Sequence, residues 1–193
     1  MTKELTTDEK IKKLNYLSKL AKEKENSKDI IEKIGIVTVY SSMVDFTLVQ
    51  AARLVEQVLL KGKLAEGKEI TLQPHGDLWF FEHQVRSRAI LKEIKKLLPF
   101  KATKPEDEDK AKFVNNSVKD FITISDKFLT ARNSIIHHIL NPKKDMKKVE
   151  SDLKKTITLF HKFMEIQKNF FEVAQPYRFS KKEMEFFYGK SKV

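Results

Sequence analysis

Apolar residues recur every three or four positions along most of the chain, the spacing of one face of an α-helix. The longest series begins after Ser27 and comprises Ile34, Val37, Ser41, Val44, Leu48, Ala51, Val55 and Val58. Another covers about 146–174 and comprises Val149, Leu153, Thr156, Phe160, Phe163, Gln167, Phe170 and Ala174. Alternating steps of three and four are typical of the seams between helices in a bundle.

Three further helices are predicted around these two. The first covers about 7–25, the second about 78–98, and the third about 107–140, where Pro105 and the acidic residues behind it favour a helix start. Between the helices, 61–77 is the main break, with three glycines and a proline; its KEITLQ segment is read as a short strand or an extended loop.

These elements predict an all-α fold, an antiparallel bundle of long helices with little or no sheet. A chain of 193 residues suits a single helical domain over 1–193. Its core is expected at about 27–175, preceded by the helix at about 7–25. A basic, aromatic tail covers 176–193 and is expected to form a final short helix or to pack a pocket.

Composition narrows the function classes. The formal net charge of +11 favours anionic partners such as RNA. The absence of cysteine excludes a disulfide scaffold and a thiolate zinc site, and it suits a reducing, cytoplasmic location. No signal peptide is visible at the start, and the longest apolar run, 34–44, is too short to span a bilayer. We therefore expect no membrane partner.

Two common types of site, a phosphate-binding loop and a metal site, are not supported by the surrounding sequence. GKLAEGK at 62–68 matches the spacing of a phosphate-binding loop, but Glu69 stands where a serine or threonine would bind magnesium. The histidines lack metal-ligand spacing, so no metal site is predicted. They are His75, His83, His137, His138 and His161.

Residues 131–139 read ARNSIIHHI and close a long predicted helix. At about 100° per residue, one side of this helix faces the core. That side carries Phe121, Phe128, Ile135 and Ile139. Arg132 borders it, and Asn133 and His137 follow within a sector of about 140°, whereas His138 lies beyond the core face. Polar groups able to do chemistry therefore gather at one helix end.

A second, narrower apolar stripe shares the sector of Arg132 and His137. It consists of Ile122, Leu129 and Ile136, spaced seven apart. A bundle helix needs one stripe for its core. The second stripe therefore either meets another copy of the chain in a twofold dimer or packs on another helix of the same chain. Both interpretations stay open at this point.

The run Arg132-Asn133-Ser134-Ile135-Ile136-His137 resembles the signature of the HEPN superfamily: an arginine, four to six residues of which the first is usually polar, and a histidine. The likeness covers about 30–175, with the signature late in the chain near a helix end. His138 fits the same spacing, although the helix projection favours His137. The resemblance implies metal-independent RNA cleavage by a homodimer without a cofactor, often as a toxin with an antitoxin protein or in abortive infection against phage.

The residue types suit that reaction. RNA carries its own nucleophile, the 2′-hydroxyl, and histidine, with an ordinary pKa of about 6.5, can accept or donate a proton at cellular pH. Arg132 would stabilise the phosphorane, His137 would transfer protons and Asn133 would position the substrate. Four lysines after the signature are expected to bind the RNA backbone. They are Lys143, Lys144, Lys147 and Lys148.

Three residues are candidates for supporting roles. His138 follows the signature histidine directly, and Asp45 and Asp126 are possible ion-pair partners of Arg132. The sequence thus favours an endoribonuclease. The alternative is a non-catalytic HEPN-like helical module that binds nucleic acid, a nucleotide or a protein partner.

Overall fold

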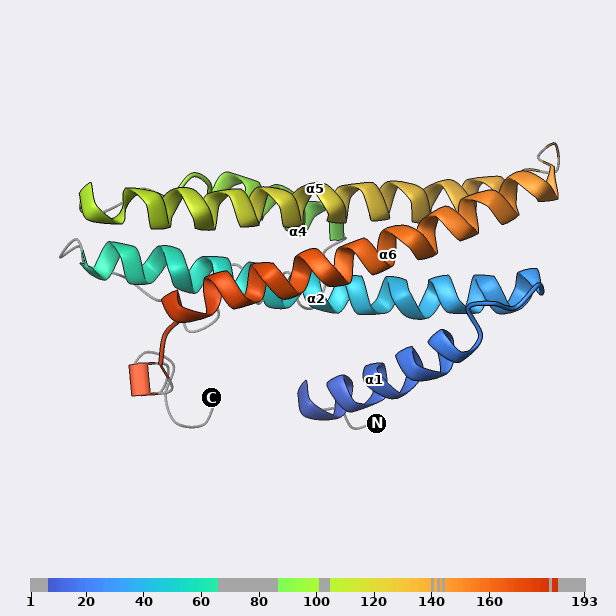
Figure 1. Cartoon of the computed structure of the whole chain (residues 1–193), viewed down its shortest axis with the longest axis horizontal. Helices are drawn as coiled ribbons and strands as arrows, with labels where there is room; N and C mark the ends of the chain where they lie inside the picture. The colour runs from blue at the N-terminus through green and yellow to red at the C-terminus, as the bar shows by residue number, and fades with distance from the viewer. Residues whose placement is uncertain are drawn as a thin grey trace. The chain divides into compact units, whose positions relative to one another are not determined.

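The computed structural model describes residues 7–65, 87–100, 105–139, 141, 143, 145–180 and 182–183. Of the described residues 89% are helical and none lies in a strand. The helices are α1 (Thr7–Glu23), α2 (Ile30–Ala65), α4 (Ser87–Lys96), α5 (Glu108–Ile139) and α6 (Met146–Ala174), with two 3-10 helices at Pro105–Asp107 and Gln175–Tyr177. Figure 1 shows α2, α5 and α6 as the long members. The predicted all-α helical bundle is confirmed.

Side-chain caps fix where two of these helices begin. The backbone N–H of Ile31 donates to Asp29 at 2.7 Å, and that of Lys147 donates to Asp145 at 3.0 Å. Each aspartate directly precedes its helix, α2 or α6, and satisfies an N–H group that has no partner within the helix. The predicted starts were close: α2 begins at Ile30, three residues after Ser27.

One predicted boundary was wrong. The break placed at residue 61 comes too early, because α2 continues to Ala65. Within this extension, the ammonium of Lys61 donates to the carbonyl of Arg178 at 3.1 Å. Three predicted features lie outside the described residues: the segment KEITLQ, residues 78–86 of the helix predicted at about 78–98, and the histidines at positions 75 and 83.

The chain forms two compact units, and each takes a part of α2, α5 and α6. The first unit comprises Met1–Phe46 and Lys127–Lys162; the second comprises Thr47–Asp126 and Phe163–Val193. The single domain expected from the sequence stays a prediction.

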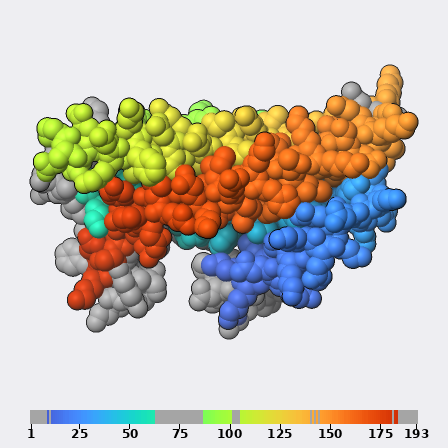
Figure 2. All heavy atoms as spheres, viewed as in Figure 1, coloured from blue at the N-terminus to red at the C-terminus, as the bar shows by residue number. Residues whose placement is uncertain are grey.

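The first unit is centred on aliphatic residues from three helices. Val37 of α2, Ile135 of α5, and Val149 and Leu153 of α6 are all buried and form one cluster. Figure 2 shows the beginning of α6 lying against the end of α5. Beside this cluster, Tyr40 stacks on a phenylalanine of α6; the Tyr40 and Phe160 ring centroids are 3.7 Å apart. Apolar packing thus sets the positions from which the polar side chains extend.

Aromatic rings dominate the core of the second unit. Phe121 of α5 lies 5.6 Å from Phe163 and 4.7 Å from Phe170, both of α6, measured between ring centroids. In the predicted tail, the 3-10 helix Gln175–Tyr177 follows α6 directly, and Phe179 is buried. The expectation for the tail as a whole stays a prediction.

Among the described residues, α2 is the one helix long and apolar enough to cross a membrane by length and composition, over Ile30–Gly62. A core helix of a bundle passes the same test, so this is weak evidence for a membrane. The stretch is longer than the apolar run 34–44 singled out in the sequence.

Candidate functional site

The guanidinium of Arg132 is attached to α2. Its Nη1 donates to both carboxylate oxygens of Asp45, each at 3.1 Å. The Arg132 side chain is 22% exposed and that of Asp45 is 44% exposed. Charge-assisted hydrogen bonds of this kind fix a long side chain in direction as well as in place. The pairing considered from the sequence is therefore present, and Asp126, the other candidate partner, is exposed.

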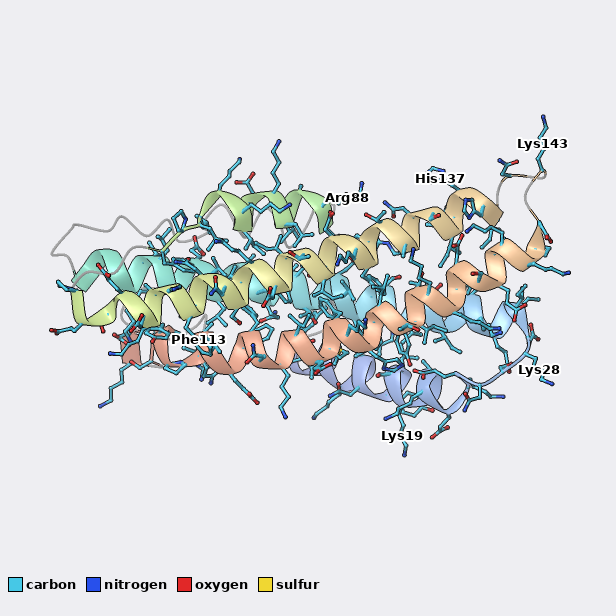
Figure 3. The ribbon with its side chains drawn as sticks, turned by 45° about the horizontal axis from the view of Figure 1, so that its top comes forward. Lys19, Lys28, Arg88, Phe113, His137 and Lys143 are labelled. Atoms are coloured by element: carbon cyan, nitrogen blue, oxygen red, sulfur yellow. The ribbon has the colours of Figure 1, made fainter. Side chains whose placement is uncertain are left out.

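His137 is exposed and projects outward near the end of α5 (Figure 3). Within the described part of the chain, neither His137 nor Asn133 makes a hydrogen bond or ion pair. Five helical positions separate Arg132 from His137, which corresponds to about 140° of rotation and about 7.5 Å of rise. Within one copy of the chain, these two side chains therefore extend from different sides of α5 and do not contact each other.

His138 has a different environment from its neighbour. Its Nδ1 lies 2.5 Å from a carboxylate oxygen of Asp152, on α6. The side chains are 18% and 13% exposed, and the ammonium of Lys148 lies 3.8 Å from the other oxygen of Asp152. His138 thus extends toward α6, whereas Arg132 extends toward α2, as the helix projection indicated.

The second apolar stripe does not form a continuous outer surface. Ile122 and Leu129 are buried, with 4% and 0% of their surface exposed, so this part of the stripe packs within the chain. Ile136 remains, 52% exposed. Ile139, expected in the core, is the last residue of α5 and is 43% exposed. Of the two interpretations that the sequence left open, packing within the same chain therefore holds for Ile122 and Leu129.

Basic residues follow the site. Lys143, Lys147 and Lys148 are exposed, and Lys144 lies outside the described residues. Figure 3 shows Lys143 directed away from the helices, near the end of α5. Within the described ranges, no group of three or more histidine, cysteine or acidic side chains is arranged to hold a metal ion.

Another polar cluster in the first unit involves residues that the sequence did not bring together. The Tyr40 hydroxyl is hydrogen-bonded to one oxygen of Glu25, and the other oxygen lies 3.0 Å from Nε2 of His161. Burial raises the pKa of Tyr40, and the hydrogen bond to Glu25 and its charge add to the effect. The phenol therefore stays neutral, and the cluster attaches the α1–α2 connection to α6.

Asp152 is the site residue that sequence reasoning missed. It belongs to no recognisable motif, and its one local signal is the spacing of four residues from Lys148, which is common on solvated helix faces. Only the packing of α6 against α5 brings it to His138.

No family model, curated protein or solved structure matches this chain. A functional proposal therefore depends on the geometry of the chain's own residues, and on Arg132 and His137 above all. Two observations bear on a possible reaction: Arg132 is hydrogen-bonded to Asp45, and His137 is exposed.

Proposed function

We propose that the protein is a metal-independent endoribonuclease of the HEPN type that acts as a homodimer. The observation that carries the proposal is the fixed guanidinium of Arg132. Both of its hydrogen bonds to Asp45 come from Nη1, so Nε and Nη2 make none within the described residues. These two nitrogens are the ones that can bind a phosphate oxygen while Asp45 keeps the side chain in position.

The reaction needs no group beyond those of the RNA and the protein. The 2′-oxygen attacks the adjacent phosphorus as its proton passes to an imidazole, and the bond from phosphorus to the 5′-oxygen breaks as that oxygen gains a proton. Products are a 2′,3′-cyclic phosphate and a 5′-hydroxyl. Arg132 stabilises the negative charge of the phosphorane, His137 transfers protons and Asn133 orients the phosphate.

A second copy supplies what one copy lacks. Arg132 and His137 lie on neighbouring flanks of α5, and a twofold axis beside this helix would bring two arginines and two histidines to a single cleft. Ile136 lies between them on the helix surface and is 52% exposed, so it is the apolar residue for that contact. One imidazole would then act as the base and the other as the acid.

The test uses purified protein and a labelled single-stranded RNA in excess EDTA. The parent is expected to cleave the RNA and leave cyclic phosphate ends. Arg132→Ala and His137→Ala are expected to lose on the order of 10³-fold in rate, the size typical of a lost proton-transfer or oxyanion-binding group. His161→Ala is the matched control: another exposed histidine of the first unit, it is expected to keep full activity. Equal cleavage by all four proteins would reject the assignment.

A non-catalytic module that binds nucleic acid is the second candidate. It is favoured by the engagement of Arg132 with Asp45 and by the exposed imidazole of His137, which itself makes no hydrogen bond or ion pair among the described residues. This candidate predicts salt-dependent RNA binding without product. If the enzyme is the correct reading, the resemblance to HEPN proteins extends the proposal to a toxin or phage-defence effector, cytoplasmic and restrained by an antitoxin protein.

A further inference from the structure

His137 stands two residues before the last residue of α5, Ile139. The last turn of a helix has carbonyl groups without helical partners and is prone to fraying. A side chain on such a turn loses its position whenever the turn opens. A reacting group needs to be held within about half an ångström of its working position, so an exposed histidine here needs an attachment that its own contacts do not provide.

The neighbouring residue provides that attachment. The 2.5 Å contact between His138 and Asp152 connects the last turn of α5 to the second turn of α6. Both side chains are largely buried, which protects the contact from water. Asp152 lies on α6 directly before Leu153, a fully buried core residue, so the carboxylate extends from a rigid position.

We propose that Asp152 is a positioning residue: by binding His138, it fixes the last turn of α5 and thereby the direction of His137. The adjacent histidines then have different roles, His137 as the proton-transferring group and His138 as the anchor. The catalytic half of this statement rests on the proposed function, and the anchoring half does not.

The contact also defines one tautomer. A carboxylate oxygen only accepts, so Nδ1 of His138 carries a hydrogen in this contact. The free imidazole prefers the other tautomer, with the hydrogen on Nε2. Nitrogen chemical shifts of His138 therefore report directly whether the anchor is formed.

The experiment compares Asp152→Ala with Ser151→Ala, its exposed neighbour on α6. Amide hydrogen exchange is measured at Ile136–Ile139, and the His138 tautomer is read by nitrogen NMR. Asp152→Ala is expected to accelerate exchange in this turn by about tenfold or more, the change expected when one anchoring contact is lost, and to abolish the Nδ1–H tautomer. Ser151→Ala is expected to change neither.

Cleavage kinetics supply the second arm. A misplaced His137 should lower kcat by about 10- to 100-fold with KM for RNA unchanged. Asp152→Asn, which keeps an acceptor oxygen, should restore part of that loss, and His138→Ala should match Asp152→Ala. Unchanged exchange in Asp152→Ala would overturn the anchor. A His138→Ala protein as inactive as His137→Ala would overturn the division of roles. If the parent cleaves no RNA, the proposed function fails, while the exchange arm still decides the anchor.

Discussion

Both units have an apolar core, and the contacts described around that core are of different kinds. In the first unit, polar pairs join one helix to another: Arg132 to Asp45, His138 to Asp152, and the buried Lys33 to Glu150 at 3.1 Å. In the second, stacked and tilted phenylalanine rings connect α5 to α6. Apolar contacts stabilise without fixing direction, whereas hydrogen-bonded ionic contacts fix direction and add little net stability.

Under the proposed function, the polar pairs of the first unit are the contacts that hold the reacting side chains. A packed aromatic core gives rigidity, and the polar pairs of the first unit hold particular side chains at defined angles. Each pair requires both partners to lose water, which evolution tolerates where orientation has a use. The four predictions below test that contrast, from the largest effect to the smallest.

Removing a ring from the second unit should destabilise the protein most. Phe121→Ala leaves a cavity beside Phe163 and Phe170, and the free energy of unfolding should fall by about 3–5 kcal/mol. Arg132→Ala, which breaks a partly exposed pair, should lower it by less than about 1 kcal/mol. Urea unfolding followed by circular dichroism measures both. Similar losses for the two variants would remove the contrast between the units.

Releasing Arg132 from α2 should affect activity more than stability. Asp45→Asn keeps the size of the side chain but removes its charge, so the guanidinium loses its fixed direction. The rate of RNA cleavage should fall by about tenfold, the size of one charge-assisted contact. Ser42→Ala, an exposed change on the same helix, is the control. A faster Asp45→Asn enzyme would show that the aspartate restrains the arginine rather than positioning it.

The lysines beyond α5 should act through their charge alone. For the double variant Lys143→Gln, Lys147→Gln, the slope of log affinity for single-stranded RNA against log salt should decrease by about 0.7 per lysine. Binding titrations at several salt concentrations provide the slope. An unchanged slope would show that Lys143 and Lys147 do not bind the RNA backbone.

The smallest expected effect is a change, caused by Glu150, in how the stability of the protein depends on pH. Hydrogen bonds from Lys154 and then Lys33 hold the pKa of Glu150 below its ordinary value of 4.5. A carboxylate with a lowered pKa in the folded state stabilises the fold above its ordinary pKa, and this stabilisation is lost as the pH falls through the lowered value. Glu150→Gln should therefore make stability less dependent on pH below about 4.5. The free energy of unfolding of the parent and of Glu150→Gln is measured from about pH 3 to about pH 7, a range that includes the ordinary carboxylate pKa values. If the two proteins lose the same stability as the pH falls, the prediction fails.

The periodic patterns predicted the helices well because burial of one face determines them. The stripe of α6 was placed correctly, and the core side of α5 was correct at Phe121, Phe128 and Ile135. The pattern could not distinguish Ile122 and Leu129, buried within the chain, from Ile136, which is exposed. An apolar residue at a helix surface looks the same in sequence whether another helix or a second copy covers it.

The candidate site was predictable only as far as α5 itself. Projection on one helix separated His137 from His138 correctly, because rotation per residue is fixed by the backbone. The partners on other helices could not be derived the same way. Asp45 was one of two carboxylates considered for Arg132, and Asp152 was not considered at all, because which turn of α6 faces which turn of α5 depends on packing.

Under the proposed function, the attachment of Arg132 through a single nitrogen distinguishes arginine from lysine at this position. A lysine would carry the same charge on one compact ammonium, which would have to leave Asp45 to reach an incoming anion. The planar guanidinium can keep hold of the protein with one edge while it offers the other. Substituting lysine here would therefore force a choice between a steady side chain and a bound ligand.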